Sequence, residues 1–166
     1  MFERIVVPLD GSRLSAQALP YATAIARQFS AEVRLVRVLT ETTVAYIPQP
    51  GGPGDTVGAD IISEQAHIKD VENAAHAKRY LMNWAKDLRD QGINASYHVL
   101  EGAPARTIME FAAAERAALI VMMSHGRGRF KRAILGSVTD AIIRGGTVPV
   151  LVIRAKDPEA QGFVPA

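Results

Sequence analysis

Short apolar runs rich in β-branched residues alternate with longer amphipathic segments along this chain, and that order constrains its fold more than any other feature. The first run, residues 4–9, reads RIVVPL and is ended by the turn-forming sequence DGS. Similar runs predict strands over 32–39, 93–100, 118–123 and 148–153, and apolar residues at helical spacing predict helices over 14–29, 61–92 and 104–114. The alternation predicts a single open five-stranded parallel sheet of the α/β class, with helices on both faces.

Prolines qualify several of these predicted elements. Pro20 lies inside the first helix and should bend it or delay its start. Pro149 lacks an amide donor, so the last strand should lie at an edge or an interface of the sheet. Residues 40–60 contain three prolines and several glycines, namely Pro48, Pro50, Pro53, Gly51, Gly52, Gly54 and Gly58. This composition predicts a long mobile loop.

The length and composition of the chain are those of a single globular domain. It has 166 residues, of which 48% are hydrophobic, and this is enough for one core. We expect one domain over residues 1–155 and a disordered tail over 156–166. No run reaches the roughly 18 apolar residues of a membrane span, and the N-terminal residues lack the regions of a signal peptide. A soluble, cytoplasmic protein without membrane partners is therefore expected.

Composition also excludes several kinds of functional site. The chain has no cysteine, which removes disulfides, thiolate nucleophiles and cysteine-ligated metals. The four histidines show no metal-ligand spacing, so no metal site built from protein side chains alone is expected. A net charge of only +2 gives no support for nucleic acid binding.

Residues 124–140, SHGRGRFKRAILGSVTD, join a basic segment with two glycines to the start of a helix. They follow the predicted fourth strand, and parallel α/β sheets bind ligands at the carboxyl ends of their strands. The stretch matches neither the Walker A pattern nor the dinucleotide fingerprint. Ser137, with Asp140 three positions later, resembles a capping box, beside which first-turn amides can bind an anion. The stretch therefore predicts an anion site at this helix N-terminus.

Other roles remain open for residues of this region. The basic residues over 127–132 could contact a nucleic acid backbone, but Phe130 is the one aromatic residue among them, which argues against single-strand binding. His125 could act as a general base or form a structural hydrogen bond. Asp10, at the end of the first strand, could contact a ligand or cap the first helix.

Four motifs cover most of the chain: IVVPLDGS at 5–12, GAPARTI at 102–108, SHGRGRFKRAILGSV at 124–138 and VPVLVI at 148–153. Together they resemble the universal stress protein family. The resemblance implies a Rossmann-like sheet with strand order 3-2-1-4-5, a homodimer formed through the last strand, possible protein partners, and a site for ATP or AMP. Mg²⁺ could accompany a bound triphosphate, because a hard cation needs only one carboxylate besides phosphate oxygens. The nucleotide-binding residues that the resemblance implies are Pro8, Leu9, Asp10, Val38, Met122, Gly126, Arg127, Gly136, Ser137, Val138 and Thr139. Asp10 would meet the ribose or adenine, and the main chain of Val38 would flank the base.

One position departs from the family's pattern. Nucleotide-binding members carry G-x-x-G-x9-G-[ST], and here Gly126, Gly136 and Ser137 match but Met123 replaces the first glycine. Its side chain would crowd the site unless it swings aside. We expect a regulatory, adenine-nucleotide-binding protein of the stress response. It would hydrolyse ATP slowly at most, because the sequence indicates no positioned base. The alternative is a protein adaptor of the same fold that binds no nucleotide.

Overall fold

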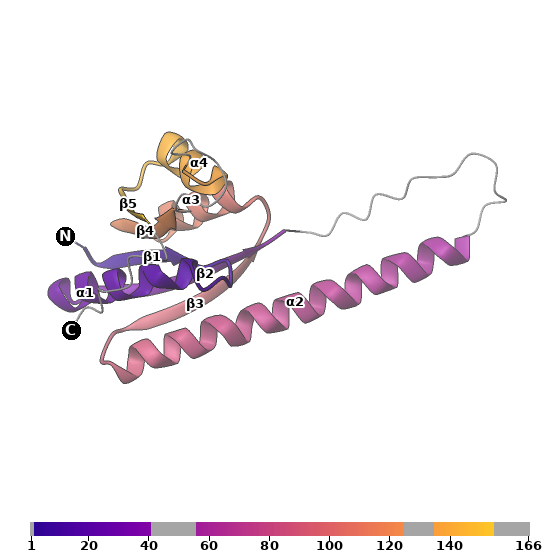
Figure 1. The fold of residues 1–166 in the computed structure, drawn as a ribbon, viewed down its shortest axis with the longest axis horizontal. Coiled ribbons are helices and arrows are strands. Elements are labelled where there is room, and N and C mark those ends of the chain that lie inside the picture. Colours follow the sequence, from indigo (N-terminus) through magenta and orange to yellow (C-terminus); the bar gives the residue numbers. More distant parts are fainter. Residues whose placement is uncertain (1, 41–55, 125–134, 155–166) are drawn as a thin grey trace, which may run out of the picture.

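The computed structural model of the chain describes residues 2–40, 56–124 and 135–154, and it has the expected α/β order (Figure 1). The strands are β1 (Arg4–Pro8), β2 (Glu32–Leu39), β3 (Ala95–Glu101), β4 (Leu119–Ser124) and β5 (Val150–Arg154). The helices are α1 (Leu19–Phe29), which follows a 3-10 turn at Ser15–Ala18, then α2 (Thr56–Asp90), α3 (Pro104–Ala114) and α4 (Ser137–Gly145).

The strands form one parallel sheet in the order β3-β2-β1-β4-β5, which confirms the predicted fold class and strand order. The register places Pro8 of β1 opposite Val36 of β2, and Val6 of β1 opposite Ile120 of β4. The chain moves outward from β1 to β3 and then returns to the other side of β1 with β4. The junction of β1 and β4 is thus the switch point at which such sheets leave room for a ligand.

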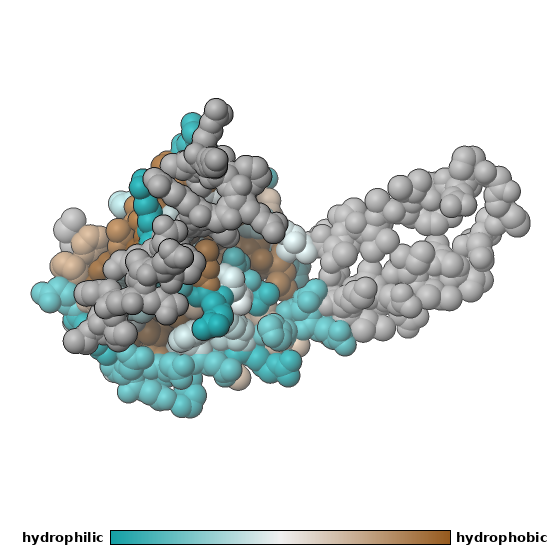
Figure 2. Space-filling model, viewed as in Figure 1, coloured by the Kyte–Doolittle hydropathy of each residue, from teal (hydrophilic) through white to brown (hydrophobic). Residues whose placement is uncertain are grey.

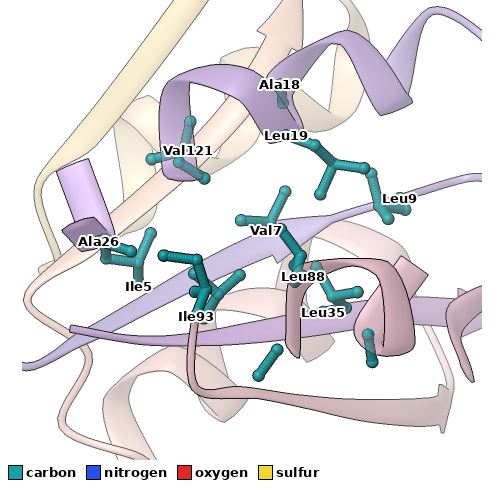
Figure 3. Close-up of a cluster of buried hydrophobic side chains, with 14 of the residues drawn as sticks. Ile5, Val7, Leu9, Ala18, Leu19, Ala26, Leu35, Leu88, Ile93 and Val121 are labelled. Atoms are coloured by element: carbon teal, nitrogen blue, oxygen red, sulfur yellow. The ribbon is translucent and has the colours of Figure 1, made fainter. Parts of the chain in front are cut away.

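Two cores cover the two faces of the sheet. Alternate residues of a strand point to opposite faces, so Ile5 and Val7 pack with α1 and α2 while Val6 packs with α3 and α4. Figure 3 shows the first core, in which side chains of β1, β2 and β4 meet Leu19 of α1 and Leu88 of α2. Figure 2 shows hydrophilic residues along the described part of α2, at the lower edge of the molecule. Each face of the sheet is therefore sealed by its own pair of helices.

Several predicted boundaries shift in the structure. Pro20 lies in the first turn of α1, because a 3-10 turn precedes the helix; the late start is confirmed and the bend is not needed. Helix α2 begins at Thr56, so the predicted start at Ile61 is wrong and residues 56–60 of the predicted loop are helical. A glycine such as Gly58 costs a helix only about 1 kcal/mol, which continuous backbone bonding in a long helix can offset.

The end of the chain differs from expectation as well. β5 lies at the sheet edge, as predicted from Pro149, but the strand begins after that proline, at Val150. The predicted tail and the rest of the predicted loop, residues 41–55, lie outside the described residues. Among the described helices, none combines the length and the apolar character needed to cross a membrane.

Candidate functional site

A pocket opens at the carboxyl ends of β1, β2 and β4, beside the switch point of the sheet. Its walls come from these strand ends, from the turn after β1, and from the first turns of α3 and α4. The lining residues are Pro8, Leu9, Asp10, Ser12, Leu14, Ser15, Val36, Val38, Pro104, Ile108, Met122, Met123, Val138 and Thr139. The pocket thus combines an apolar floor with a polar turn on one side and a helix N-terminus on another.

The polar side is the turn that ends β1. Gly11 has a φ of +89°, a conformation that side chains disfavour, and it turns the chain out of the sheet. The Ser12 amide then donates to Oδ1 of Asp10 at 2.8 Å, and the Asp10 amide donates to Oγ of Ser15 at 3.3 Å. Asp10 therefore stabilises the turn itself. The 3-10 turn that follows has Leu14 as its N-cap, without a side-chain hydrogen bond, so the predicted alternative of a helix cap by Asp10 is wrong.

The main chain of Val38 is directed toward the pocket side of β2. The Leu39 carbonyl accepts from the Gly102 amide at 2.9 Å, which shows that Leu39 faces β3. Backbone groups of consecutive strand residues alternate between the two neighbouring strands, so Val38 faces the side of β1. β1 has already ended there, since its last bond to β2 joins the Leu9 amide to the Val36 carbonyl at 2.8 Å. Beyond that bond, Val38 borders the pocket rather than a strand.

The N-terminus of α4 forms the far wall. Gly136 is the N-cap, and the first helical bond runs from the Asp140 amide to the Gly136 carbonyl at 2.9 Å. The amides of Ser137, Val138 and Thr139 precede that bond, so they lack acceptors inside the helix and carry the positive end of its dipole. Since Val138 and Thr139 line the pocket, this end of the helix borders it.

The predicted capping box does not form. Ser137 is the first residue of the helix rather than its N-cap, and no side chain caps the helix among the described residues. Asp140 instead accepts from Nε of Arg144, one turn later, at 2.9 Å. The glycine at the cap leaves the first-turn amides uncovered by a cap side chain, which suits an anion better than a capping box would.

The two methionines of β4 form part of the floor. Met122 and Met123 are 6% and 8% exposed, and they point to opposite faces of the sheet, yet both reach the pocket at the strand end. Met123 packs in the core under α1 and α2. Its placement at the pocket agrees with the concern that it narrows the space where the family pattern has a glycine.

Most of the predicted site residues that the structure describes come together at this pocket. The pocket is lined by Pro8, Leu9, Asp10, Val38, Met122, Val138 and Thr139. Gly136 is the N-cap of α4 and Ser137 its first residue, so both directly precede the lining residues of that helix. Gly126, Arg127 and His125 lie outside the described residues. Sequence reasoning missed Ser12, Leu14, Ser15, Val36, Pro104 and Ile108. The DGS turn signalled Ser12, and the helix-starting proline signalled Pro104, but neither signal says which way a side chain points.

A separate ionic cluster lies at the amino ends of β2 and β3, at the end of the sheet opposite the pocket. Arg34 donates to Glu32 at 2.9 Å and also to the Glu115 carboxylate, and the Ser96 hydroxyl donates to Glu32 at 3.1 Å. Burial alone would raise the pKa of Glu32, but these hydrogen bonds and the Arg34 charge lower it overall. Burial, reinforced by Arg34, lowers the pKa of His98. No group of three or more metal-ligating side chains occurs in the described ranges.

Comparisons with known proteins agree with this architecture. The model of the universal stress protein family matches residues 1–154. Universal stress protein MJ0531 of Methanocaldococcus jannaschii is 32% identical over 96% of this chain and 86% of its own length. The solved structure of MJ0577, from the same organism, is 27% identical with a TM-score of 0.74 and covers 95% of this chain and 99% of that one. A universal stress protein from Archaeoglobus fulgidus, solved in complex with dAMP, is 26% identical with a TM-score of 0.57, covering 92% of this chain and 98% of that one. The chain therefore belongs to the universal stress protein family.

Proposed function

We propose that this protein binds an adenine nucleotide in the pocket at the carboxyl ends of β1, β2 and β4, and that it acts as a nucleotide-responsive regulator in the stress response. The observation that carries the proposal is the meeting, in one pocket, of a helix N-terminus, a carboxylate-bearing turn and an outward-facing main chain. These three features match the three parts of a nucleotide.

Each part of the nucleotide has a counterpart in the pocket. The phosphates lie at the first turn of α4, where the amides of Ser137, Val138 and Thr139 and the helix dipole attract an anion. The purine lies against the apolar floor and exchanges hydrogen bonds with the main chain at Val38. Asp10 meets the ribose hydroxyls with its carboxylate, which the Ser12 amide holds in place at 2.8 Å.

The Archaeoglobus fulgidus relative in complex with dAMP supports the choice of an adenine nucleotide. Mg²⁺, if it accompanies ATP, takes most of its ligands from phosphate oxygens and water, because hard cations need few protein carboxylates when a triphosphate is present. Asp10 is the acidic residue among those that line the pocket. Hydrolysis would be slow, since the described lining residues include no histidine, lysine or glutamate to position a water.

The biological role that we propose is regulatory. Binding would favour one conformation of the segments around the pocket, and thereby one state of a homodimer formed through β5 in the cytoplasm. A protein adaptor that binds no nucleotide is the competing function, because the same fold could present its surface to partners without filling the pocket.

Isothermal titration with ATP and AMP tests the proposal, together with thermal unfolding at millimolar nucleotide. Binding should release or absorb heat and raise the unfolding temperature. Gly136→Val should abolish this response and leave the fold intact, because Gly136 has φ of −53° and ψ of 151°, which valine adopts without strain. Ala141→Val, on an exposed position of the same helix, is the matched control and should bind normally. Absence of any binding by the wild-type chain would favour the adaptor.

A further inference from the structure

We propose that α2 pairs with α2 of a second copy of this chain, antiparallel, through an exposed face formed by Val71, Ala75, Lys78 and Met82. All four side chains are exposed, Val71 to 55% and Met82 to 43%. Their spacing of three and four residues places them in one stripe on the helix. This interaction is independent of what the pocket binds.

The stripe is distinct from the face that α2 packs on the sheet. That inner face consists of Ala77, Leu81, Ala85 and Leu88, which are at most 3% exposed. Each residue of the stripe from Lys78 onward follows a residue of the inner face directly, and consecutive helix residues are about 100° apart around the axis. The stripe is therefore turned to the flank of the helix, where neither the sheet nor α1 covers it.

Figure 1 shows where a second helix has room to lie along α2. The helix continues well past the edge of the sheet toward its N-terminal end, and no other described element runs beside that part. In an antiparallel pair of these helices with the two stripes in contact, the two sheets lie toward opposite ends of the pair.

Charge complementarity indicates that the partner of the stripe is a second copy of this chain, and that the two α2 helices run antiparallel. Glu72 and Arg79 are both exposed, and they lie on the same outer border of the stripe, seven residues apart. Neither takes part in an ion pair within the described part of the chain. In an antiparallel pair centred between these two residues, Glu72 meets the partner's Arg79 and Arg79 meets the partner's Glu72. Because the arrangement is twofold symmetric, the same patch on each copy forms two equivalent ion pairs between Glu72 and Arg79.

The same arrangement brings the apolar residues together. Val71 lies opposite the partner's Met82, and Ala75 lies opposite the aliphatic stem of the partner's Lys78, whose ammonium group remains in water. The patch covers about three helical turns, which is small for a stable interface. The pairing should therefore be weak and dependent on concentration and salt.

Charge reversal followed by sedimentation velocity over a range of protein concentrations tests the pairing. Glu72→Arg and Arg79→Glu should each weaken self-association by roughly tenfold, because two attractive contacts become repulsive. The double variant Glu72→Arg/Arg79→Glu should restore it. Asp87→Arg is the matched control, since it makes the same charge change at an exposed site on the outer side of α2. Equal association of all four variants, or failure of the double variant to recover, would overturn the proposal.

Cysteine trapping separates this contact from a dimer formed elsewhere, because the native chain has no cysteine. Val71→Cys/Met82→Cys should form a disulfide-linked dimer on mild oxidation with diamide. His76→Cys/Asp87→Cys has the same separation of eleven positions, at exposed sites off the stripe, and should stay monomeric on a non-reducing gel. Equal cross-linking of the two double variants contradicts the stripe, and equal cross-linking of Val71→Cys alone contradicts the antiparallel direction.

Discussion

Replacement of Gly11 by alanine offers a test of how tightly the turn after β1 is fixed. Gly11 has a φ of +89°, and a Cβ added there would lie 2.7 Å from Nη1 and 3.0 Å from Cζ of Arg37. The left-handed conformation costs an alanine about 1–2 kcal/mol. The close approach also forces the guanidinium of Arg37 from its place 5.8 Å above the ring of Tyr80, a cation–π contact of about 0.5–1 kcal/mol.

The two contributions predict that Gly11→Ala lowers the free energy of unfolding by about 1.5–3 kcal/mol. Gly92→Ala is the matched control: Gly92 has a φ of +79° and nothing within 4 Å of the added Cβ, so it incurs the backbone strain alone. Urea unfolding of both variants, monitored by circular dichroism, should show Gly11→Ala to be the more damaging by about 0.5–1 kcal/mol.

The Arg37→Ala background completes the test of Gly11. There the obstructing guanidinium is gone, so Gly11→Ala should cost no more than Gly92→Ala. If the excess cost of Gly11→Ala persists without Arg37, the clash is not its cause. If the two glycine variants are equally stable in the native background, Arg37 yields without loss and the reasoning about its contact with Tyr80 fails.

Three further predictions concern the pocket, the ionic cluster and the sheet edge. Met123→Ala should lower the free energy of unfolding by about 2–5 kcal/mol yet bind ATP more tightly in titration calorimetry, and unchanged or weaker binding would show that this side chain does not crowd the site. Since the pKa of His98 lies below its ordinary 6.5 and that of Glu32 below 4.5 in the folded protein, the unfolded chain takes up protons first, and stability should fall as the pH drops through those values. His98→Gln should remove only the upper part of this fall in urea unfolding at a series of pH values, and an unaltered profile would contradict the assignment. Leu151→Asp, on edge strand β5 and 36% exposed in the wild type, should halve the mass measured by light scattering at concentrations too low for α2 pairing, and an unchanged mass would contradict a homodimer through β5.

The strands and most helices could be predicted because each has a periodicity that only one kind of element satisfies. The run at 32–39 became β2 with those bounds, and the helix at 104–114 became α3. The predicted start of α2 is too late because Gly58 is typical of a loop, although one glycine does not stop a long helix.

Pocket residues could be predicted where they belong to a recognisable turn or helix start. They could not be predicted where tertiary packing alone brings a core residue to the pocket. Asp10 and Thr139 follow from the turn and from the helix start. Val36 and Ile108 are ordinary core residues in the sequence, and only the way in which α3 lies across β2 brings them to the pocket. The N-cap fell on Gly136 rather than Ser137, because a single-residue shift of a helix start leaves the sequence pattern unchanged.

The two methionines at the end of β4 belong to different halves of the molecule, Met123 to the layer beneath α1 and α2 and Met122 to the layer above, with α3 and α4. Leu9 belongs to the core with Met123, and Val36 belongs to the core with Met122. A ligand bound among these four side chains therefore contacts both cores. Such a ligand would couple the stability of the two cores. Amide hydrogen exchange should therefore slow in α1 and in α4 together, although these helices lie on opposite sides of the sheet and do not share a core.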